Sequence, residues 1–271
     1  NLETYPVKAF NASQYLVKKV ERDNGIGGFF TESYLYEAAR FQTLGIGYLG
    51  FRKITKTNQT DETKTISDYA INTTHFFQYP SNLKIQDLFG NTIQESSFEF
   101  IPKKPNSENY YSILLSKRIT KFYEINLPSN PLYKVEIDEY LSYDDYGNCT
   151  SLKSSQGADL LNMNYYTTST NNYSNYILND KWVLGRLDEA IVSTNAPNAD
   201  PIIKKSNFTY YDQMTNPEFG MLKEEVSFPD SINIKLTKTY SYDKYGNIDT
   251  TKYIGVDIDD RYFISHYTSN G

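Results

Sequence analysis

The chain has 271 residues, enough for one large domain or two small ones, and 26 of them are tyrosine against one tryptophan. A net charge of −6 argues against binding nucleic acid or an anionic membrane through bulk charge. One cysteine excludes an internal disulfide framework and a cysteine-based zinc cluster, and two histidines leave little for acid–base chemistry.

Strand signals follow one another along the chain as short segments rich in Tyr, Phe, Ile, Val and Thr. The first predicted strands are 5–20, 29–36, 51–57, 63–71 and 83–87. Residues 235–242 alternate apolar with polar, which indicates a strand with one face on a core and the other in water. Branched and aromatic side chains suit such a half-buried pleated surface.

Helical periodicity is nearly absent. Residues 37–41 and 181–192 could pass for helix starts. The second segment contains Gly185 and has no clear N-cap followed by a long apolar stripe, so we predict a strand there. Short strands separated by turn signals predict an all-β chain built from consecutive antiparallel hairpins.

One turn motif recurs. Residues 143–148 read Tyr-Asp-Asp-Tyr-Gly-Asn, residues 242–247 read Tyr-Asp-Lys-Tyr-Gly-Asn, and residues 86–91 keep the Asp-x-x-Gly-Asn part. The Asp can accept from backbone amides two or three residues on, and the Gly can adopt the left-handed conformation of a G1 bulge. We therefore predict hairpin tips, with Tyr211-Asp212 and Gly220 as a degenerate fourth copy. The predicted turn residues are Asp87, Gly90, Asn91, Asp144, Gly147, Asn148, Asp243, Gly246 and Asn247.

The side chains that could carry chemistry have simpler structural interpretations. Neither His75 nor His266 has a neighbouring ligand at metal spacing, and Cys149 could act as a nucleophile only if one of them approached it. The chain has no Gly-x-Ser-x-Gly elbow and no Walker loop. We expect no catalytic residue, no cofactor and no enzymatic activity.

Two groups of carboxylates are further candidates. Asp257, Asp259 and Asp260 could hold calcium but lack the Gly and distal Glu of an EF-hand loop, so a solvated hairpin tip is the simpler interpretation. An acid pair could come from a second group, but no substrate-binding context marks it. This group contains Asp138, Glu139, Asp144 and Asp145. We predict no metal site.

At these motifs the sequence resembles the Rhs, or YD-repeat, family. Residues 240–247 match its Tyr-x-Tyr-Asp-x-x-Gly-Asn/Arg repeat, and residues 140–148 match with one extra residue. Residues 47–54 resemble the Gly-x-Leu-Gly-Phe-Arg-x-Val segment of insecticidal toxin complex B components and Salmonella-virulence-B-like proteins, and residues 182–186 resemble a second segment of that group. The motif residues are Gly47, Leu49, Gly50, Phe51, Arg52, Trp182, Gly185 and Arg186.

The resemblance spans about residues 34–267, where 255–267 looks like the start of another repeat. It implies a spiralling β-strip that forms part of a hollow shell, with teneurins as distant relatives. Residues 1–271 would then be one continuous segment of a larger protein or assembly, coarsely divided into 1–102, with the Gly-x-Leu-Gly-Phe-Arg motif, and 103–271, with the YD repeats. Tyrosines would pack across strands, with their hydroxyls in water or on a partner.

The function implied is a non-enzymatic wall that encloses, protects or presents another polypeptide, such as a toxin or effector. Its partners would be the rest of the shell and the enclosed cargo, in a secreted or cell-surface bacterial system. The chain itself has no signal peptide and no apolar run near the roughly 20 residues of a membrane span, so we expect no integral membrane protein. The alternative is a cell-surface adhesin or a module that binds glycan or protein, with a contiguous exposed aromatic groove as the distinguishing feature.

Related shells often end in a self-cleaving segment with Asp-Pro-x-Gly motifs. Here Asp200-Pro201 is followed by Ile202 and Ile203, so we expect no self-cleavage by these residues. The chain also looks too short to close a shell. Unpaired strand edges invite association, so we expect the segment expressed alone to associate or to be partly unfolded.

Overall fold

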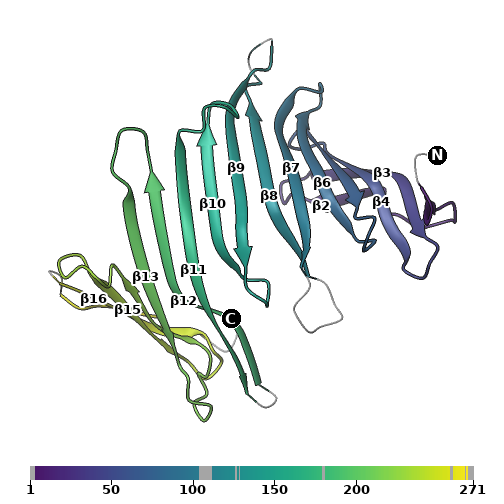
Figure 1. Ribbon diagram of the computed structural model, residues 1–271. Coiled ribbons are helices and arrows are strands. Elements are labelled where there is room, and N and C mark those ends of the chain that lie inside the picture. The colour runs from purple at the N-terminus through teal and green to yellow at the C-terminus, as the bar shows by residue number, and fades with distance from the viewer. Residues whose placement is uncertain are drawn as a thin grey trace. The chain divides into compact units, whose positions relative to one another are not determined.

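The computed structural model describes residues 4–103, 112–125, 127, 129–178, 181–256, 259–265 and 267. The described part contains strands and turns and no helix, as Figure 1 shows, and so no helix that could cross a membrane. The all-β prediction is confirmed. The strands are β1 (Val7–Ala9), β2 (Lys19–Asp23), β3 (Phe29–Gln42), β4 (Gly47–Asn58), β5 (Thr63–Ile71), β6 (Gln78–Asp87), β7 (Thr92–Lys103), β8 (Ser112–Tyr123), β9 (Leu132–Tyr143), β10 (Cys149–Gly157), β11 (Tyr165–Leu178), β12 (Lys181–Asn195), β13 (Ile202–Tyr210), β14 (Leu222–Ser227), β15 (Leu236–Tyr242), β16 (Ile248–Gly255) and β17 (Arg261–Ile264).

Consecutive strands pair with one another. From β2 to β9 and again from β11 to β17, each strand is antiparallel to the next along the chain. Strand β9 also pairs with β10. Strand β1 instead joins β3, to which β2 is also paired. The predicted succession of antiparallel hairpins is therefore confirmed.

The chain divides into two compact units. The first consists of Asn1–Glu139 with Ser155–Asn164, and the second of Tyr140–Ser154 with Tyr165–Gly271. The boundary therefore runs through β9 and β10, and the hairpin tip at Asp144 belongs to the second unit. The division proposed at residues 102 and 103 stays a prediction.

The sheet buries few apolar side chains. Among the described residues, only Val7, Leu49 and Val135 are buried hydrophobic residues, and all three belong to the first unit. Polar groups are buried as well, for example Ser96 and Thr120, whose hydroxyl oxygens lie 3.1 Å apart on paired positions of β7 and β8. Cross-strand pairs, more than a central apolar core, therefore hold this sheet together.

Several of those pairs carry opposite charges. Lys84 faces Glu95 across β6 and β7 with 3.4 Å between Nζ and Oε1. In the second unit, Lys238 faces Glu225 across β14 and β15 at 3.3 Å. Each pair is partly exposed and contributes about 0–1 kcal/mol, so these pairs specify strand register more than they stabilise the fold.

The strand predicted over residues 5–20 is wrong in its middle part. Only β1 and β2 form there, and residues 10–18 are an irregular connection. Ala9 pairs with Arg40 and Lys19 pairs with Ser33 on the same edge of β3, so residues 10–18 face the shorter stretch 34–39. The longer segment, residues 10–18, cannot stay in register with the shorter segment, residues 34–39, and it leaves the sheet.

The two ambiguous segments are strands. Residues 37–41 lie within β3, so the helix start considered there is wrong. Residues 181–192 lie within β12, as predicted. Strand β12 contains a bulge opposite Asn172–Tyr173 and a second opposite Ser174–Tyr176. These bulges shift the alternation of side chains and explain why the sequence there shows no clean period of two.

Candidate functional site

The hairpin tip predicted at Asp243 is closed by hydrogen bonds within the main chain and by hydrogen bonds to the Asp243 side chain. The Asp243 amide donates to the Asn247 carbonyl (2.9 Å), and the Gly246 amide donates to the Asp243 carbonyl (3.0 Å). The register shifts at Tyr242, and Gly246 has a φ of 87°, as a G1 bulge requires. The Asp243 carboxylate accepts from the amides of Tyr245 (2.8 Å) and Asn247 (2.9 Å).

The Asn at the end of each motif has a role that the sequence did not reveal. Its side chain returns to the Asp, with Asn247 Nδ2 at 3.0 Å from Asp243 Oδ2 and Asn91 Nδ2 at 2.7 Å from Asp87 Oδ2. Hydrogen bonds from these Asn side chains hold the pKa of Asp243 and of Asp87 below the ordinary aspartate value. Each tip is thus an ionised Asp clamped by an Asn four residues later.

The tip at Asp144 has the same clamp, with Asn148 Nδ2 at 2.8 Å from Asp144 Oδ2 and the Asn148 amide at 2.9 Å from Oδ1. Desolvation raises the pKa of this carboxyl, but hydrogen bonds from Asn148, Asn175 and the Tyr146 amide outweigh it, and the pKa is lowered. A related clamp that the sequence analysis missed joins Asn162 to Asp159 at 2.7 Å. Its spacing is one residue shorter, so no repeat search for the full motif would find it.

The degenerate fourth copy forms a different turn. Its connection is closed by Tyr211, whose amide donates to the Met221 carbonyl (3.0 Å) and whose carbonyl accepts from the Gly220 amide (2.8 Å). The Asp212 side chain is exposed, and no clamp of the Asp-Asn kind forms there. In this longer connection, main-chain hydrogen bonds close the turn, whereas an Asp–Asn side-chain contact helps to close the other tips.

The Gly-x-Leu-Gly-Phe-Arg segment forms the first part of β4. Leu49 is buried, and the Phe51 ring lies 4.9 Å from Tyr36 and 6.1 Å from Tyr48, measured between centroids. Gly50 pairs with Arg40 where the register shifts, and a Cβ there would lie 2.8 Å from Gln78 Oε1. Gly47 occupies the start of the strand with a φ of 85°. The segment thus provides a buried anchor, an aromatic contact and a close backbone approach.

The second family-like segment contacts the hairpin tip at Asp144. In β12, the Gly185 amide donates to Asn175 Oδ1 (2.8 Å), and Asn175 Nδ2 lies 3.3 Å from Asp144 Oδ2. A Cβ on Gly185 would lie 2.8 Å from Asn148 Oδ1. Residues predicted separately as turn and motif are therefore brought together within the second unit.

The other two motif residues of this segment, Trp182 and Arg186, lie in different environments. The Arg186 guanidinium lies over two rings, 5.7 Å from the Tyr176 centroid and 5.2 Å from the Tyr210 centroid. Trp182 has 71% of its surface exposed. Arg186 therefore joins neighbouring strands by cation–π contacts, whereas Trp182 is available at the surface.

Tyrosine hydroxyls in the second unit bond to the main chain. Tyr210 donates to the Leu187 carbonyl (3.0 Å), Tyr242 to that of Leu222 (2.8 Å) and Tyr211 to that of Tyr240 (2.9 Å). Burial, followed by the Glu225 charge, raises the pKa of Tyr240 to about 12. These rings lie along the sheet and bridge strands.

The residues considered for catalysis form structural contacts. Cys149 Sγ donates to the Ser151 carbonyl (3.3 Å), and burial raises the pKa of its thiol, which disfavours the reactive thiolate. His75 lies in a turn where its amide donates to Asn72 Oδ1 (2.9 Å). His266 lies outside the described residues. Among the described residues, the burial of Cys149 therefore favours its neutral thiol.

Two of the four carboxylates considered as an acid pair, Asp138 and Glu139, are engaged in ion pairs. Asp138 accepts from Arg118 Nε (2.8 Å), and Glu139 Oε1 lies 3.5 Å from Lys117 Nζ, both across β8 and β9. Asp260 pairs with Lys252 (2.7 Å), while Asp257 lies outside the described residues. Within the part of the chain that the structure describes, no group of three potential metal ligands converges.

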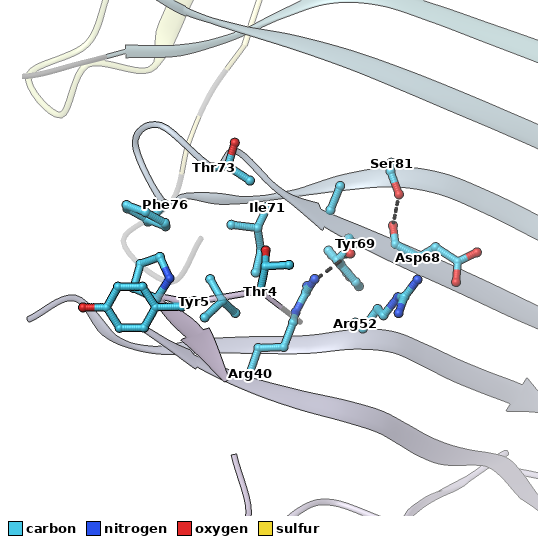
Figure 2. A pocket seen from close by; sticks show the side chains of 13 residues that line it. Thr4, Tyr5, Arg40, Arg52, Asp68, Tyr69, Ile71, Thr73, Phe76 and Ser81 are labelled. Atoms are coloured by element: carbon cyan, nitrogen blue, oxygen red, sulfur yellow. Dashed lines mark hydrogen bonds between the residues drawn. The ribbon is translucent and has the colours of Figure 1, made fainter. Parts of the chain in front are cut away.

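A groove opens in the first unit where β4 and β5 separate. Their pairing ends at Lys53 and Asp68, and beyond it residues 69–71 pair only with β6 among the described strands. The groove has a volume of about 420 Å³. Figure 2 shows Arg40 on its wall with the guanidinium directed at the Tyr69 carbonyl, and Arg52 beside Asp68.

Arg40 is a buried residue in the lining of this groove. It is 4% exposed, and its Nη2 donates to the carbonyl of Tyr69 (3.1 Å) and to Gln78 Oε1 (3.2 Å). The sequence did not single out Arg40, because its partners lie in strands far along the chain. Arg52, the last residue of the Gly-x-Leu-Gly-Phe-Arg motif, lines the same groove and is exposed.

Comparison with solved structures identifies a shared fold. The chain is similar to the crystal structure of TcdB2-TccC3, with a TM-score of 0.53 and 11% identity, and to that of TcdB2-TccC3-Cdc42 with the same values. TcdB2-TccC3 without its hypervariable C-terminal region gives a TM-score of 0.51. In each case the match covers 87% of this chain and 16% of the other, so this chain spans about a sixth of their length. No protein-family model and no curated protein sequence matches the chain.

Proposed function

We propose that the chain is a non-enzymatic wall segment of an Rhs/YD-repeat shell that encloses, protects or presents another polypeptide. The observation that carries the proposal is the contact between the hairpin tip at Asp144 and the Trp-Val-Leu-Gly-Arg segment through Asn175 and Gly185. In this arrangement the family-like residues act as turns, bulges and clamps. The fold likeness to TcdB2-TccC3 supports the same assignment.

The tyrosine contacts favour a wall over a glycan-binding surface. The hydroxyls of Tyr210, Tyr211 and Tyr242 donate hydrogen bonds to main-chain carbonyls of nearby strands. A ring held along a sheet in this way stabilises strand pairing and offers little free face for a sugar. A toxin or effector would be the enclosed polypeptide, in a secreted or cell-surface setting.

Cryo-electron microscopy of the protein with its natural flanking sequence tests this function. We expect these 271 residues to form part of the wall of a hollow particle, with density for a second polypeptide inside. A compact domain whose strands pack face to face around a filled core would contradict the proposal. Specific glycan binding that Trp182→Ala abolishes would favour the adhesin alternative instead.

The non-enzymatic part of the proposal has its own test. We expect hydrolase substrate panels to show no turnover that depends on Cys149 or Asp138, because burial disfavours the thiolate of Cys149 and Asp138 is paired with Arg118. Turnover lost on Cys149→Ser or Asp138→Asn, with the fold retained by circular dichroism, would contradict it.

A further inference from the structure

The turn between β2 and β3 contains an Asn-Gly pair, Asn24-Gly25, directly after Asp23. A side-chain amide followed by Gly is open to attack by the next main-chain nitrogen, because Gly has no side chain to block the approach. Gly25 is exposed, and a Cβ built on it would meet nothing within 4 Å. The surroundings of the Gly25 nitrogen are therefore open as well.

Two main-chain amides hold the side-chain oxygen of Asn24. Its Oδ1 accepts from the amide of Ile26 (3.0 Å) and from that of Gly28 (2.9 Å). The clamped tips use their Asn in the opposite way, since there the Asn nitrogen donates to an Asp. Two amides directed at one carbonyl oxygen stabilise the negative charge that develops on it when the carbon is attacked, as the donors of an oxyanion hole do.

A carboxylate faces the nitrogen that would attack. The Gly25 amide donates to Asp23 Oδ1 at 2.7 Å, within the roughly 2.6–3.2 Å reach of a general base. The turn is also closed in the main chain, where the Asn24 amide donates to the Gly28 carbonyl (3.0 Å). Residues 23–28 therefore hold a nucleophile, a base and two oxyanion donors in one fixed arrangement.

We propose that Asn24 is a self-modification site, at which the Gly25 nitrogen displaces the side-chain amide and water then leaves aspartate or isoaspartate at position 24. The Gly25 nitrogen bonds to Asn24 Cγ, and its proton passes to Asp23. The Cγ–Nδ2 bond then breaks, and Nδ2 takes up that proton and leaves as ammonia, which gives a cyclic succinimide. Water adds to either ring carbonyl and opens the ring. The net reaction consumes one water and releases one ammonia, with no oxidant or reductant.

The modification would weaken the end of β2. The product has a second carboxylate next to Asp23, and like charges repel. Isoaspartate also adds a methylene group to the main chain. Both changes lie where the pairing of β2 with β3 ends, at Asp23 and Phe29. The proposal stands on this turn and does not depend on the shell assignment.

Peptide mapping by mass spectrometry tests the proposal on the full 271-residue chain, aged at neutral pH in water labelled with heavy oxygen. We expect loss of the Asn24 amide, one heavy oxygen in the product, and both aspartate and isoaspartate at position 24. The comparison is a synthetic peptide of residues 20–30, which has the same Asp, Asn and Gly but no fixed turn. We expect the folded chain to react about tenfold faster than the peptide, because the turn positions the reacting groups.

Asn72 is an internal control in the same map. Its Oδ1 also accepts from two amides, those of Thr74 (3.0 Å) and His75 (2.9 Å). Ile71 precedes it and Thr73 follows it, so its turn has neither the carboxylate nor the unhindered nitrogen. We expect Asn72 to keep its amide while Asn24 loses it.

Asp23→Ala tests the base. We expect it to slow the reaction of the folded chain by about tenfold. We also expect the rate of the variant to rise more steeply with pH, because hydroxide must then remove the proton. Asp212→Ala, at an exposed Asp in a turn of the second unit, should leave the rate unchanged.

Three results would overturn the proposal or a part of it. A folded chain that reacts no faster than the peptide would overturn the turn as the cause of the reaction. An unchanged rate and pH profile in Asp23→Ala would overturn the role of Asp23, and aspartate without isoaspartate would overturn the succinimide route. If Asp23→Ala fails to fold by circular dichroism, the comparison of the unaltered chain with the peptide still decides.

Discussion

Asn148 Oδ1 lies 2.8 Å from the position that a Cβ on Gly185 would occupy. Asn148 ends the hairpin tip that begins at Asp144, and Gly185 lies in β12 with a φ of 72°. Asn175 links the two by accepting from the Gly185 amide (2.8 Å) and donating to Asp144 (3.3 Å). This contact requires a residue without a side chain at position 185, which gives the first prediction.

Gly185→Ala is expected to destabilise the chain by about 1–3 kcal/mol, because the new Cβ adds a close contact with Asn148 to a left-handed backbone. Gly90→Ala is the matched control, since Gly90 has a φ of 95° but open space around its Cβ, and it should cost about 1 kcal/mol. Urea unfolding of both variants, of Asn148→Ala alone and of Gly185→Ala combined with Asn148→Ala, measures the difference. Additive costs in the double variant would show that Asn148 is not the obstacle.

Replacement of Gly246 by Val is expected to cost about 1–2 kcal/mol or more, because φ is 87° there and a branched side chain rarely adopts that region. The same reasoning applies to Gly147, with a φ of 88°. Gly246→Asn is the control, since Asn tolerates the left-handed conformation better. Equal unfolding free energies for the Val and Asn variants would contradict the turn geometry.

The ionised Asp243 side chain, held by Asn247, predicts that the stability of the chain depends on pH in the acid range. Its pKa is lowered in the folded state, so its stabilising contribution is present above the ordinary aspartate pKa of 3.8 and is lost as the pH falls through the folded value. Asp243→Asn should therefore lower the urea midpoint at neutral pH, and the difference from the unaltered chain should shrink below about pH 4. Asp212→Asn, at a turn without the clamp, is the control. A difference that persists unchanged in acid would contradict the prediction.

The raised pKa of Tyr240 predicts that its phenol ionises late in an alkaline titration. Burial and Glu225 raise its pKa to about 12, so the stability that depends on the neutral phenol is fully present below about pH 10 and is lost as the pH rises through the folded value. We expect Tyr240→Phe to remove part of the phenolate absorbance that appears latest in a titration. Tyr15→Phe, at a fully exposed ring, should leave that late part unchanged. Loss of the same absorbance from both variants would contradict the assignment.

The exposed edge of β17 leads us to expect that the isolated chain associates with other copies of itself. It pairs with β16 alone among the described strands, and Tyr262, Phe263 and Ile264 are 57%, 61% and 61% exposed. Phe263→Lys should reduce association in sedimentation velocity, because a charge on an edge strand opposes further pairing. Leu161→Lys, which places the same charge at an exposed turn position of the first unit, is the control. A sharp, cooperative, monomeric melt of the unaltered chain at low concentration would contradict the edge argument.

Short-range chemistry made the hairpins predictable. The Asp-x-x-Gly-Asn tips at Asp87, Asp144 and Asp243 depend on hydrogen bonds within five residues, so their pattern is visible in the sequence. The all-β class follows equally from residue type and alternation. The connection over residues 10–18 escaped prediction, because alternation says nothing about the length of the partner strand that a segment must match.

The tertiary structure decided how distant motifs meet. Gly185 meets a hairpin tip 37 residues earlier through Asn148, and Arg40 reaches the carbonyl of Tyr69 and the side chain of Gln78. These contacts depend on strand register and on bulges that shift it, and register is set jointly by several paired strands. The groove at Arg52 arises for the same reason, since the pairing of β4 with β5 stops at Lys53 and Asp68. Local sequence encodes the turns, whereas the ladder of strand pairs between them places the charged and polar groups against one another.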